Sequence, residues 1–181
     1  MNQEISHSRQ LAELKWGRAM KRPLILLFHG KGVISRIIRW QTRSYYSHAA
    51  IIFPDGVVYE AWQGSARKFY RNSGVRKTVL TSTEGVDAFD IPGVTDSQYL
   101  KLRTCLNEEV GQKYDYISVL RFLTRREPHN NRKWFCSELI VHFLLRVGVR
   151  ILNLEPSKVS PGQIKWSPLV RKIKCVTQKQ G

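Results

Sequence analysis

The helix that decides the fold begins in the stretch Trp134-Phe135-Cys136-Ser137-Glu138-Leu139-Ile140. Apolar residues recur after it at helical spacing as far as Gly148, and glycine commonly ends helices. Cys136 is therefore predicted to lie in or just before the first helical turn. Unpaired backbone N–H groups and the positive end of the helix dipole lie there, and both favour a thiolate over a thiol.

A thiolate nucleophile needs a base, and His48 offers one at the start of the strand-like stretch Ser47-His48-Ala49-Ala50-Ile51-Ile52-Phe53. The turn Pro54-Asp55-Gly56 then leads to a second expected strand, Val57–Trp62, which contains Glu60. If the loop consists of these three turn residues, His48 and Glu60 share one face of the hairpin as diagonal neighbours within side-chain reach. A two-residue loop would place them on opposite faces.

Cys136, His48 and Glu60 can together form a catalytic set of nucleophile, base and orienting carboxylate. The competing interpretation is a hydrogen-bonded core histidine for His48 and a surface acid for Glu60. A carboxylate within the otherwise apolar strand Val57–Trp62 favours the orienting role. His129 is the rival base, but it lies in an expected loop, and a flexible loop fixes geometry poorly.

The order of these residues resembles that of a known enzyme family. His48 in Tyr-Ser-His-Ala, then Glu60, then Cys136 in Phe-Cys-Ser-Glu-Leu is similar to the circularly permuted NlpC-type papain-like hydrolases, particularly the YiiX-like branch. Lecithin–retinol acyltransferase relatives are more distantly similar. The resemblance implies a permuted papain-like α+β fold, in which a small antiparallel sheet packs against helices. It also implies a thiol hydrolase or acyltransferase that acts on amide or ester bonds through these three residues.

The resemblance extends over residues 24–168 and includes the segments 32–40 and 111–116. We therefore expect an N-terminal helical extension in residues 1–22 and a permuted papain-like hydrolase domain in residues 23–181. Hydrophobic spacing and turn residues indicate the remaining elements. Helices are predicted at 4–20, 33–40, 96–110 and 114–123, and strands at 23–28, 86–91 and 170–176.

The composition suits one globular domain with a basic surface. The chain has 181 residues, 42% of them apolar, which is enough for a sizeable core. Thirty Lys and Arg against fourteen Asp and Glu give a formal net charge of +16. This excess predicts an anionic partner such as phosphate, a membrane surface, nucleic acid or a wall polymer. No standard nucleic-acid motif accompanies the charge, so nucleic acid has the weaker support.

The cysteine count and the N-terminus indicate a reducing compartment. Three cysteines argue against a disulfide framework, and neither Cys105 nor Cys175 has the helix-start context of Cys136. No Cys/His spacing suggests zinc, so neither a metal nor a cofactor is expected. Residues 1–20 contain no signal-peptide core, and the apolar run 24–28 is too short to span a membrane. The protein is therefore expected to be cytoplasmic.

Four residues are predicted to bind substrate: Arg67, Tyr114, Arg126 and Lys133. The last two belong to a basic cluster before Cys136, where positive charge can stabilise a thiolate and hold an anion. Arg67 lies in the basic stretch 63–79, which is either a cationic lid over an anionic substrate or a solvated loop. Tyr114 is a candidate oxyanion ligand, with core packing as the competing interpretation.

We expect a cysteine hydrolase that cleaves amide bonds, of the peptide or cell-wall stem-peptide type, through an acyl-enzyme. Two alternatives stay open. One is a lipid acyl hydrolase or acyltransferase at an anionic membrane, and the other is a non-enzymatic cationic binding protein on the same fold. The expected partner is an anionic or peptide-like substrate, either a wall fragment or a lipid.

Overall fold

The computed structural model describes residues 1–62, 73–114 and 133–176, without the side chains of Val33, Ile34 and Lys133. The strands are β1 (Leu24–Phe28), β2 (His48–Ile52), β3 (Val57–Trp62), β4 (Gly74–Val79), β5 (Val86–Asp90), β6 (Lys113–Tyr114), β7 (Lys133–Trp134) and β8 (Arg171–Lys172). The α-helices are α1 (Asn2–Trp16), α2 (Val33–Thr42), α3 (Asp96–Glu108) and α5 (Cys136–Arg146). The 3₁₀ helices are η1 (Gly17–Lys21), η2 (Pro156–Lys158) and η3 (Pro161–Trp166).

The described residues form the expected α+β fold, in which a small antiparallel sheet packs against helices. Six strands lie in the order β4-β3-β2-β1-β5-β8, and each neighbouring pair is antiparallel. β6 and β7 form a separate parallel pair. The apolar strands β1 and β2 lie in the middle, because a strand covered on both faces needs apolar side chains in both directions. No helix in the described part is long and apolar enough to cross a membrane.

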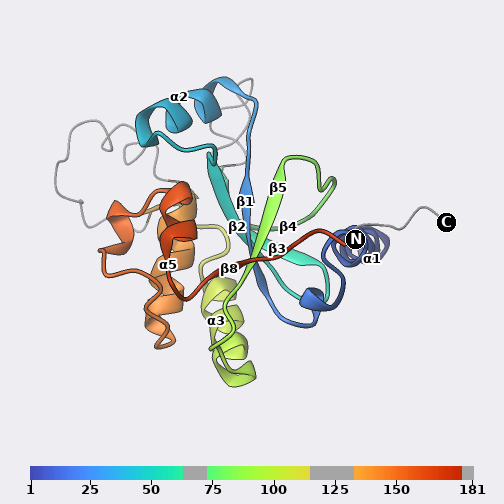
Figure 1. Cartoon of the computed structure of the whole chain (residues 1–181). Coiled ribbons are helices and arrows are strands. Elements are labelled where there is room, and N and C mark those ends of the chain that lie inside the picture. The colour runs from blue at the N-terminus through green and yellow to red at the C-terminus, as the bar shows by residue number, and fades with distance from the viewer. Residues whose placement is uncertain (63–72, 115–132, 177–181) are drawn as a thin grey trace.

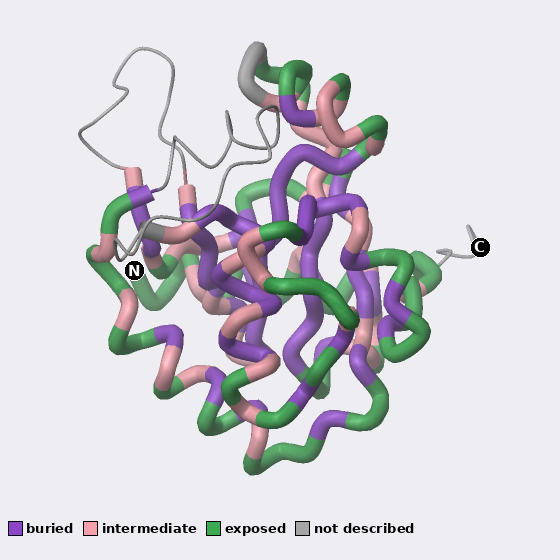
Figure 2. The backbone as a smooth tube through the Cα atoms, turned by 90° about the vertical axis from the view of Figure 1, so that its left-hand side faces the viewer, coloured by how far each residue is buried: buried purple, intermediate pink, exposed green. Residues whose placement is uncertain are grey.

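Two apolar clusters fill the space on the two sides of the sheet, because successive strand residues point to opposite sides. One cluster joins alternate strand residues, such as Leu27, Ile51 and Tyr59, to helices α3 and α5. The other joins the intervening residues, such as Ile52, to α1. Figure 1 shows α3 and α5 on one side of the sheet and α1 on the other, and Figure 2 shows the buried strands. Each Leu or Ile buried in this way contributes roughly 1.5–3 kcal/mol.

The N-terminal helix α1 is tied to the sheet by Ser8. Its hydroxyl donates to the carbonyl oxygen of Gly56 (2.6 Å) and accepts a hydrogen bond from the backbone N–H of Leu80 (2.8 Å). Gly56 has a φ of 90°, and a Cβ there would lie 2.6 Å from the carbonyl oxygen of Ile5. The close approach of helix and turn therefore requires glycine. The segment expected as an N-terminal extension thus covers one side of the sheet.

Helix α5 begins at Cys136, where the apolar spacing predicted a helix start. The backbone N–H of Phe135 donates to the carboxylate of Glu138 (3.3 Å), which satisfies one of the groups that helix starts leave unpaired. Gly148, just after the helix, has a φ of 84°, the left-handed conformation that glycine adopts without strain. Local sequence signals therefore define both ends of the helix.

The prediction of a loop or lid at 63–79 is wrong for its second part, because residues 74–79 form strand β4 beside β3. Val75 is buried, and the guanidinium of Arg76 forms an ion pair with Glu60. The ion pair with Glu60 thus compensates the charge of Arg76, one of the charges that had indicated a solvent-exposed segment. Residues 63–72 lie outside the described part.

Two further predictions of secondary structure need correction. Tyr114 lies in strand β6, where it pairs with Trp134, instead of opening a helix. The rest of that predicted helix, residues 115–123, lies outside the described residues. The strand expected at 170–176 is reduced to the two residues of β8, because only they pair with β5.

Candidate active site

The β2–β3 hairpin brings a histidine and a carboxylate together. The pairing of the two strands is centred on Asp55, the register expected for a three-residue loop. Nε2 of His48 and Oε2 of Glu60 are 2.6 Å apart, and each side chain is 6% exposed. The contact predicted between His48 and Glu60 is therefore present, and it is buried.

Cys136 is the first residue of α5 and is fully buried. The first turn of α5 is fixed by Ser137, whose hydroxyl donates to the carbonyl oxygen of Val159 (2.5 Å). The first N–H groups of an α-helix have no partner within the helix, so this position favours negative charge. A substrate must displace neighbouring atoms to reach the sulfur.

Cys136 interacts with the imidazole ring of His48. Burial lowers the pKa of His48, but the nearby Cys136 and the hydrogen bond and charge of Glu60 outweigh it. Together they raise the pKa of His48 to about 10. Because Glu60 occupies Nε2, Nδ1 is the nitrogen left to exchange a proton with the sulfur. Nδ1 is buried and has no hydrogen-bond partner in the described part of the chain, so it is free to take up a proton.

His48 lies at the end of the sheet. By strand alternation, His48 shares a side with Ala50 and Ile52, which pack toward α1, whereas α5 covers the other side. His48 is the first residue of β2, and β2 and β3, both wholly described, pair only at Ile51 and Ile52. His48 therefore lies beyond the paired part of the β2–β3 hairpin, while it still pairs with Phe28 of β1.

Two residues missed by the sequence analysis complete the surroundings of Glu60. Nε and Nη2 of Arg76 lie 2.8 and 2.6 Å from Oε1 of Glu60, and the guanidinium lies 4.7 Å from the ring centre of Trp62. Trp62 packs edge-on against His48, with 5.5 Å between ring centres. Burial raises the pKa of Glu60, but His48 and Arg76 outweigh it and lower the pKa. The carboxylate is thus ionised and held from two sides.

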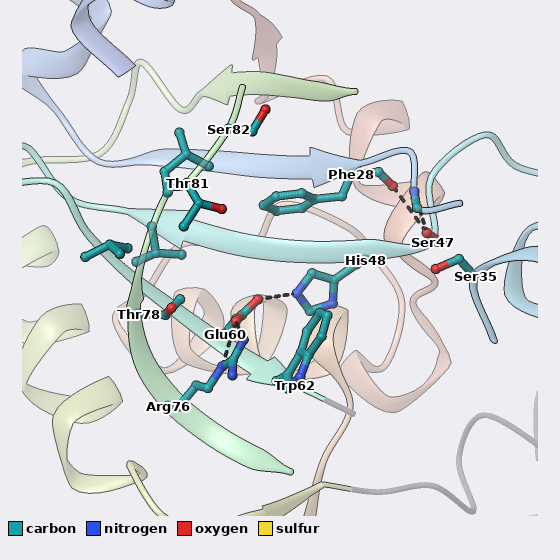
Figure 3. Close-up of a pocket in the computed structure, with 14 residues that line it drawn as sticks. Phe28, Ser35, Ser47, His48, Glu60, Trp62, Arg76, Thr78, Thr81 and Ser82 are labelled. Atoms are coloured by element: carbon teal, nitrogen blue, oxygen red, sulfur yellow. Dashed lines mark hydrogen bonds and ion pairs between the residues drawn. The ribbon is translucent and has the colours of Figure 1, made fainter. Parts of the chain in front are cut away.

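A pocket of about 360 Å³ lies beside His48 and Glu60 (Figure 3). Its walls combine the aromatic rings of Phe28 and Trp62 with hydroxyl groups. The hydroxyl-bearing residues are Ser35, Ser47, Thr78, Thr81 and Ser82. The volume falls in the lower part of the range for small-ligand sites. Cys136 is not among the described residues that line it, so the pocket suits a part of the substrate next to His48 rather than the attacked carbonyl.

Of the four residues predicted to bind substrate, Tyr114 is the one whose side chain is described. It is buried, and its ring centre lies 6.3 Å from that of Phe135, the residue before Cys136. This position supports the packing interpretation of Tyr114. Arg67, Arg126 and the rival base His129 lie outside the described residues, as does the side chain of Lys133, whose backbone is in β7.

Replacing Cys136 by alanine is expected to lower the pKa of His48, because Cys136 is the largest influence that raises it. In the wild type, His48 is expected to stay protonated until the pH approaches about 10. Its interactions then stabilise the fold fully below about pH 6.5, the ordinary pKa of histidine, and lose this effect as the pH rises toward 10. NMR titration of the imidazole resonances measures both values.

His142 serves as the internal control for this titration. It packs against Trp134 and Phe143, with 4.9 and 5.0 Å between ring centres, and burial together with Arg146 lowers its pKa. We expect His142 to titrate below pH 6.5 in both proteins. Two results would contradict the interaction between His48 and Cys136. One is a wild-type His48 resonance that titrates below pH 6.5, and the other is a His48 pKa that Cys136→Ala leaves unchanged.

Comparison with known proteins supports the fold. No protein-family profile matches the chain, and no curated protein matches its sequence. Among the solved structures that match is the metalloprotein yiiX from Escherichia coli O157:H7 (DUF1105), with a TM-score of 0.62 and 16% sequence identity. The match covers 86% of this chain and 97% of that chain. The resemblance to YiiX is therefore confirmed at the level of the fold.

The description as a metalloprotein applies to yiiX. Among the described residues of this chain, no group of three or more His, Cys, Asp or Glu side chains is arranged to hold a metal ion. The carboxylate of Glu60 is already taken by His48 and Arg76. The two proteins share a fold.

Proposed function

We propose that this chain is a cysteine hydrolase of the circularly permuted papain-like type, which cleaves amide bonds in peptides or cell-wall stem peptides through an acyl-enzyme. The observation that carries the proposal is the linked set of Cys136, His48 and Glu60, in which one ring nitrogen of His48 meets Glu60 and the other is left for Cys136. A nucleophile, a base and an orienting carboxylate in this order are what thiol hydrolysis requires.

The charges of the set support a reactive cysteine. With a pKa of about 10, the ring of His48 carries a proton at neutral pH. The negative groups that stabilise this proton are Glu60 at Nε2 and the sulfur of Cys136 on the other side, so the pair favours a thiolate beside an imidazolium. Glu60 fixes the ring orientation and steadies its positive charge.

The proposed reaction begins from the thiolate–imidazolium pair, in which Nδ1 of His48 already holds the proton of the Cys136 thiol. The thiolate attacks the carbonyl carbon, and the backbone N–H of Cys136 stabilises the resulting oxyanion. The C–N bond then breaks as His48 returns the proton to the leaving amine, which leaves a thioester on Cys136. Water, deprotonated by His48, attacks the thioester, and the sulfur departs as the acid product is released.

His48 can supply the acid that cleavage of an amide requires. An amine leaves readily only when it is protonated as the C–N bond breaks, and the protonated ring of His48 can donate that proton. His48 meets this requirement because both Glu60 and Cys136 stabilise its protonated form. The pocket beside His48, with aromatic and hydroxyl groups, suits a peptide-like leaving group.

The lipid alternative keeps a specific observation in its favour. A lipid acyl hydrolase or acyltransferase would use the same three residues, and the chain exposes large apolar residues such as Trp40 and Tyr45 near basic side chains. A non-enzymatic binding protein on the same fold would rely on the +16 charge alone and would not need an intact set of Cys136, His48 and Glu60.

The mass of the acyl group trapped on Cys136 tests these alternatives. The protein is incubated separately with wall fragments and with phospholipids, quenched in acid, digested and analysed by mass spectrometry. We expect a peptide-derived acyl group on the Cys136 peptide, and none on the corresponding peptide of Cys136→Ala. A fatty acyl group on Cys136 instead establishes the lipid alternative, and turnover that persists in Cys136→Ala contradicts the cysteine mechanism.

A further inference from the structure

Helix α2 exposes an apolar ridge flanked by arginines. Arg36 and Trp40 are spaced i and i+4, so they lie on one face of the helix, with Ile37 beside them, and Arg43 directly follows the helix. Ile38, on the opposite face, is buried in the core. Trp40 is 76% exposed and Ile37 is 43% exposed. Large apolar side chains gathered on an exposed face commonly mark an interaction site.

Further exposed aromatic residues lie close to this helix. Tyr45 follows the helix and is 74% exposed, and Trp166, the last residue of η3, is 66% exposed. η3 packs directly against the segment after α2, because a Cβ on Gly162 would collide with the side chain of Ser44. We define the α2 surface as Arg36, Ile37, Trp40, Arg43, Tyr45, Lys165 and Trp166.

The positive charge of the α2 surface is not offset by acidic neighbours. No Asp or Glu occurs between residues 29 and 54 or after Glu155. Within the described residues, none of Arg36, Arg43 and Lys165 forms an ion pair. The surface therefore combines exposed apolar groups with uncompensated cations, and its partner has to be both apolar and anionic.

We propose that the α2 surface docks on an anionic lipid bilayer. Arginine and lysine can reach the lipid phosphates, tryptophan and tyrosine rings are suited to the headgroup region, and Ile37 can enter the acyl boundary. A nucleic acid would pair with the arginines and stack on the rings, but it would give the aliphatic side chain of Ile37 no apolar partner. Figure 1 shows α2 beyond the ends of β1 and β2.

Docking on this surface places the candidate active site close to the bilayer. Ser35, on the same helix, lines the pocket beside His48 and Glu60 (Figure 3). The pocket therefore lies within about one helix diameter, about 10–12 Å, of the docked face. None of the docking residues belongs to the catalytic set, so the docking proposal stands or falls independently of the proposed hydrolysis.

Sedimentation of the full-length protein with lipid vesicles tests the proposal. We expect binding to phosphatidylglycerol vesicles at least about tenfold tighter than to phosphatidylcholine vesicles. Arg36→Glu/Arg43→Glu is expected to weaken binding to the anionic vesicles at least about tenfold, because each basic residue near the surface contributes to the attraction. Trp40→Ser is expected to weaken binding several-fold and to reduce the lipid-induced blue shift in tryptophan fluorescence, of which Trp166 supplies the rest.

Lys101→Glu/Lys113→Glu is the matched control. It makes the same change in net charge at two exposed lysines on α3 and β6, away from the α2 surface, and it is expected to keep binding within about twofold. Equal losses in both charge variants would show that net charge alone binds lipid, and would overturn the proposal. Retention of a single-stranded oligonucleotide but not of vesicles would assign the surface to nucleic acid. Cys136→Ala is expected to bind vesicles like the wild type, whatever its activity.

Discussion

Replacing Cys136 by alanine is expected to lower the rate of hydrolysis at least about 10³-fold, because no acyl-enzyme can form without the sulfur. His48→Ala is expected to cause a loss of similar size, since neither a base for the thiol nor an acid for the leaving amine remains. Because the two residues act as one unit, the double variant is expected to be about as slow as either single variant. Steady-state rates on the substrate found by acyl trapping measure all three.

Circular dichroism and thermal unfolding check that each variant in this series is folded. Cys136→Ala removes one buried sulfur atom from a tightly packed helix start and is expected to keep the native fold. If the loss of hydrolysis rate in the double variant equals the product of the losses in the two single variants, Cys136 and His48 act independently, contrary to the proposal. A substantial rate in the folded Cys136→Ala variant would place the chemistry elsewhere.

Replacing Arg76 by methionine is expected to destabilise the protein by about 3 kcal/mol, because it leaves the buried carboxylate of Glu60 without its cation. Glu60 is 6% exposed, and the hydrogen bond to His48 remains as its single strong partner among the described residues. Adding Glu60→Gln to Arg76→Met is therefore expected to recover part of the loss, since it removes the buried charge. Urea unfolding of the two variants measures the free energies.

Arg103→Met is the matched control for this prediction. Arg103 also pairs with a carboxylate, that of Asp55, and its guanidinium lies 5.1 Å from the ring centre of Phe53. Asp55, however, is 40% exposed, so solvent can replace the arginine, and a loss of no more than about 1 kcal/mol is expected. Equal destabilisation by Arg76→Met and Arg103→Met would show that the burial of Glu60 adds nothing to the Arg76 ion pair.

The sequence predicted the parts of the site that depend on local rules. The register between His48 and Glu60 follows from the three-residue turn and strand alternation, so it could be derived without a structure. The start of α5 at Cys136 follows from apolar spacing and the terminal glycine. The approach of Cys136 to His48 came from family resemblance, because no local rule joins residues that far apart in the sequence.

Arg76 and Trp62 were missed because their roles arise from tertiary pairing. Val75 and Val79 follow strand alternation, but the adjacent charges of Arg76 and Lys77 concealed the strand. Only the β3–β4 register, in which Glu60 lies opposite Arg76, shows that the arginine is a partner of the carboxylate. The charges of Arg76 and Lys77 therefore indicated a solvent-exposed segment, whereas in the fold Glu60 compensates the charge of Arg76.

The +16 charge could not be assigned to a surface from composition. A helix was expected at 33–40, but the exposure of Trp40 depends on which face of α2 packs on the core. The complete burial of Cys136 is also a tertiary property, because it depends on how α5 docks on the sheet.

The rates at which the three cysteines react with iodoacetamide at pH 7, followed by peptide mass spectrometry, test the proposed ion pair most directly. Cys175 is exposed, Cys105 is partly buried and Cys136 is fully buried, so accessibility alone would make Cys136 the slowest. We predict that Cys136 reacts at least about tenfold faster than both, because it is held as a thiolate by His48, and that His48→Ala removes this advantage. A Cys136 that reacts no faster than Cys105 and Cys175 in the wild type would contradict the claim that this chain contains an activated nucleophile.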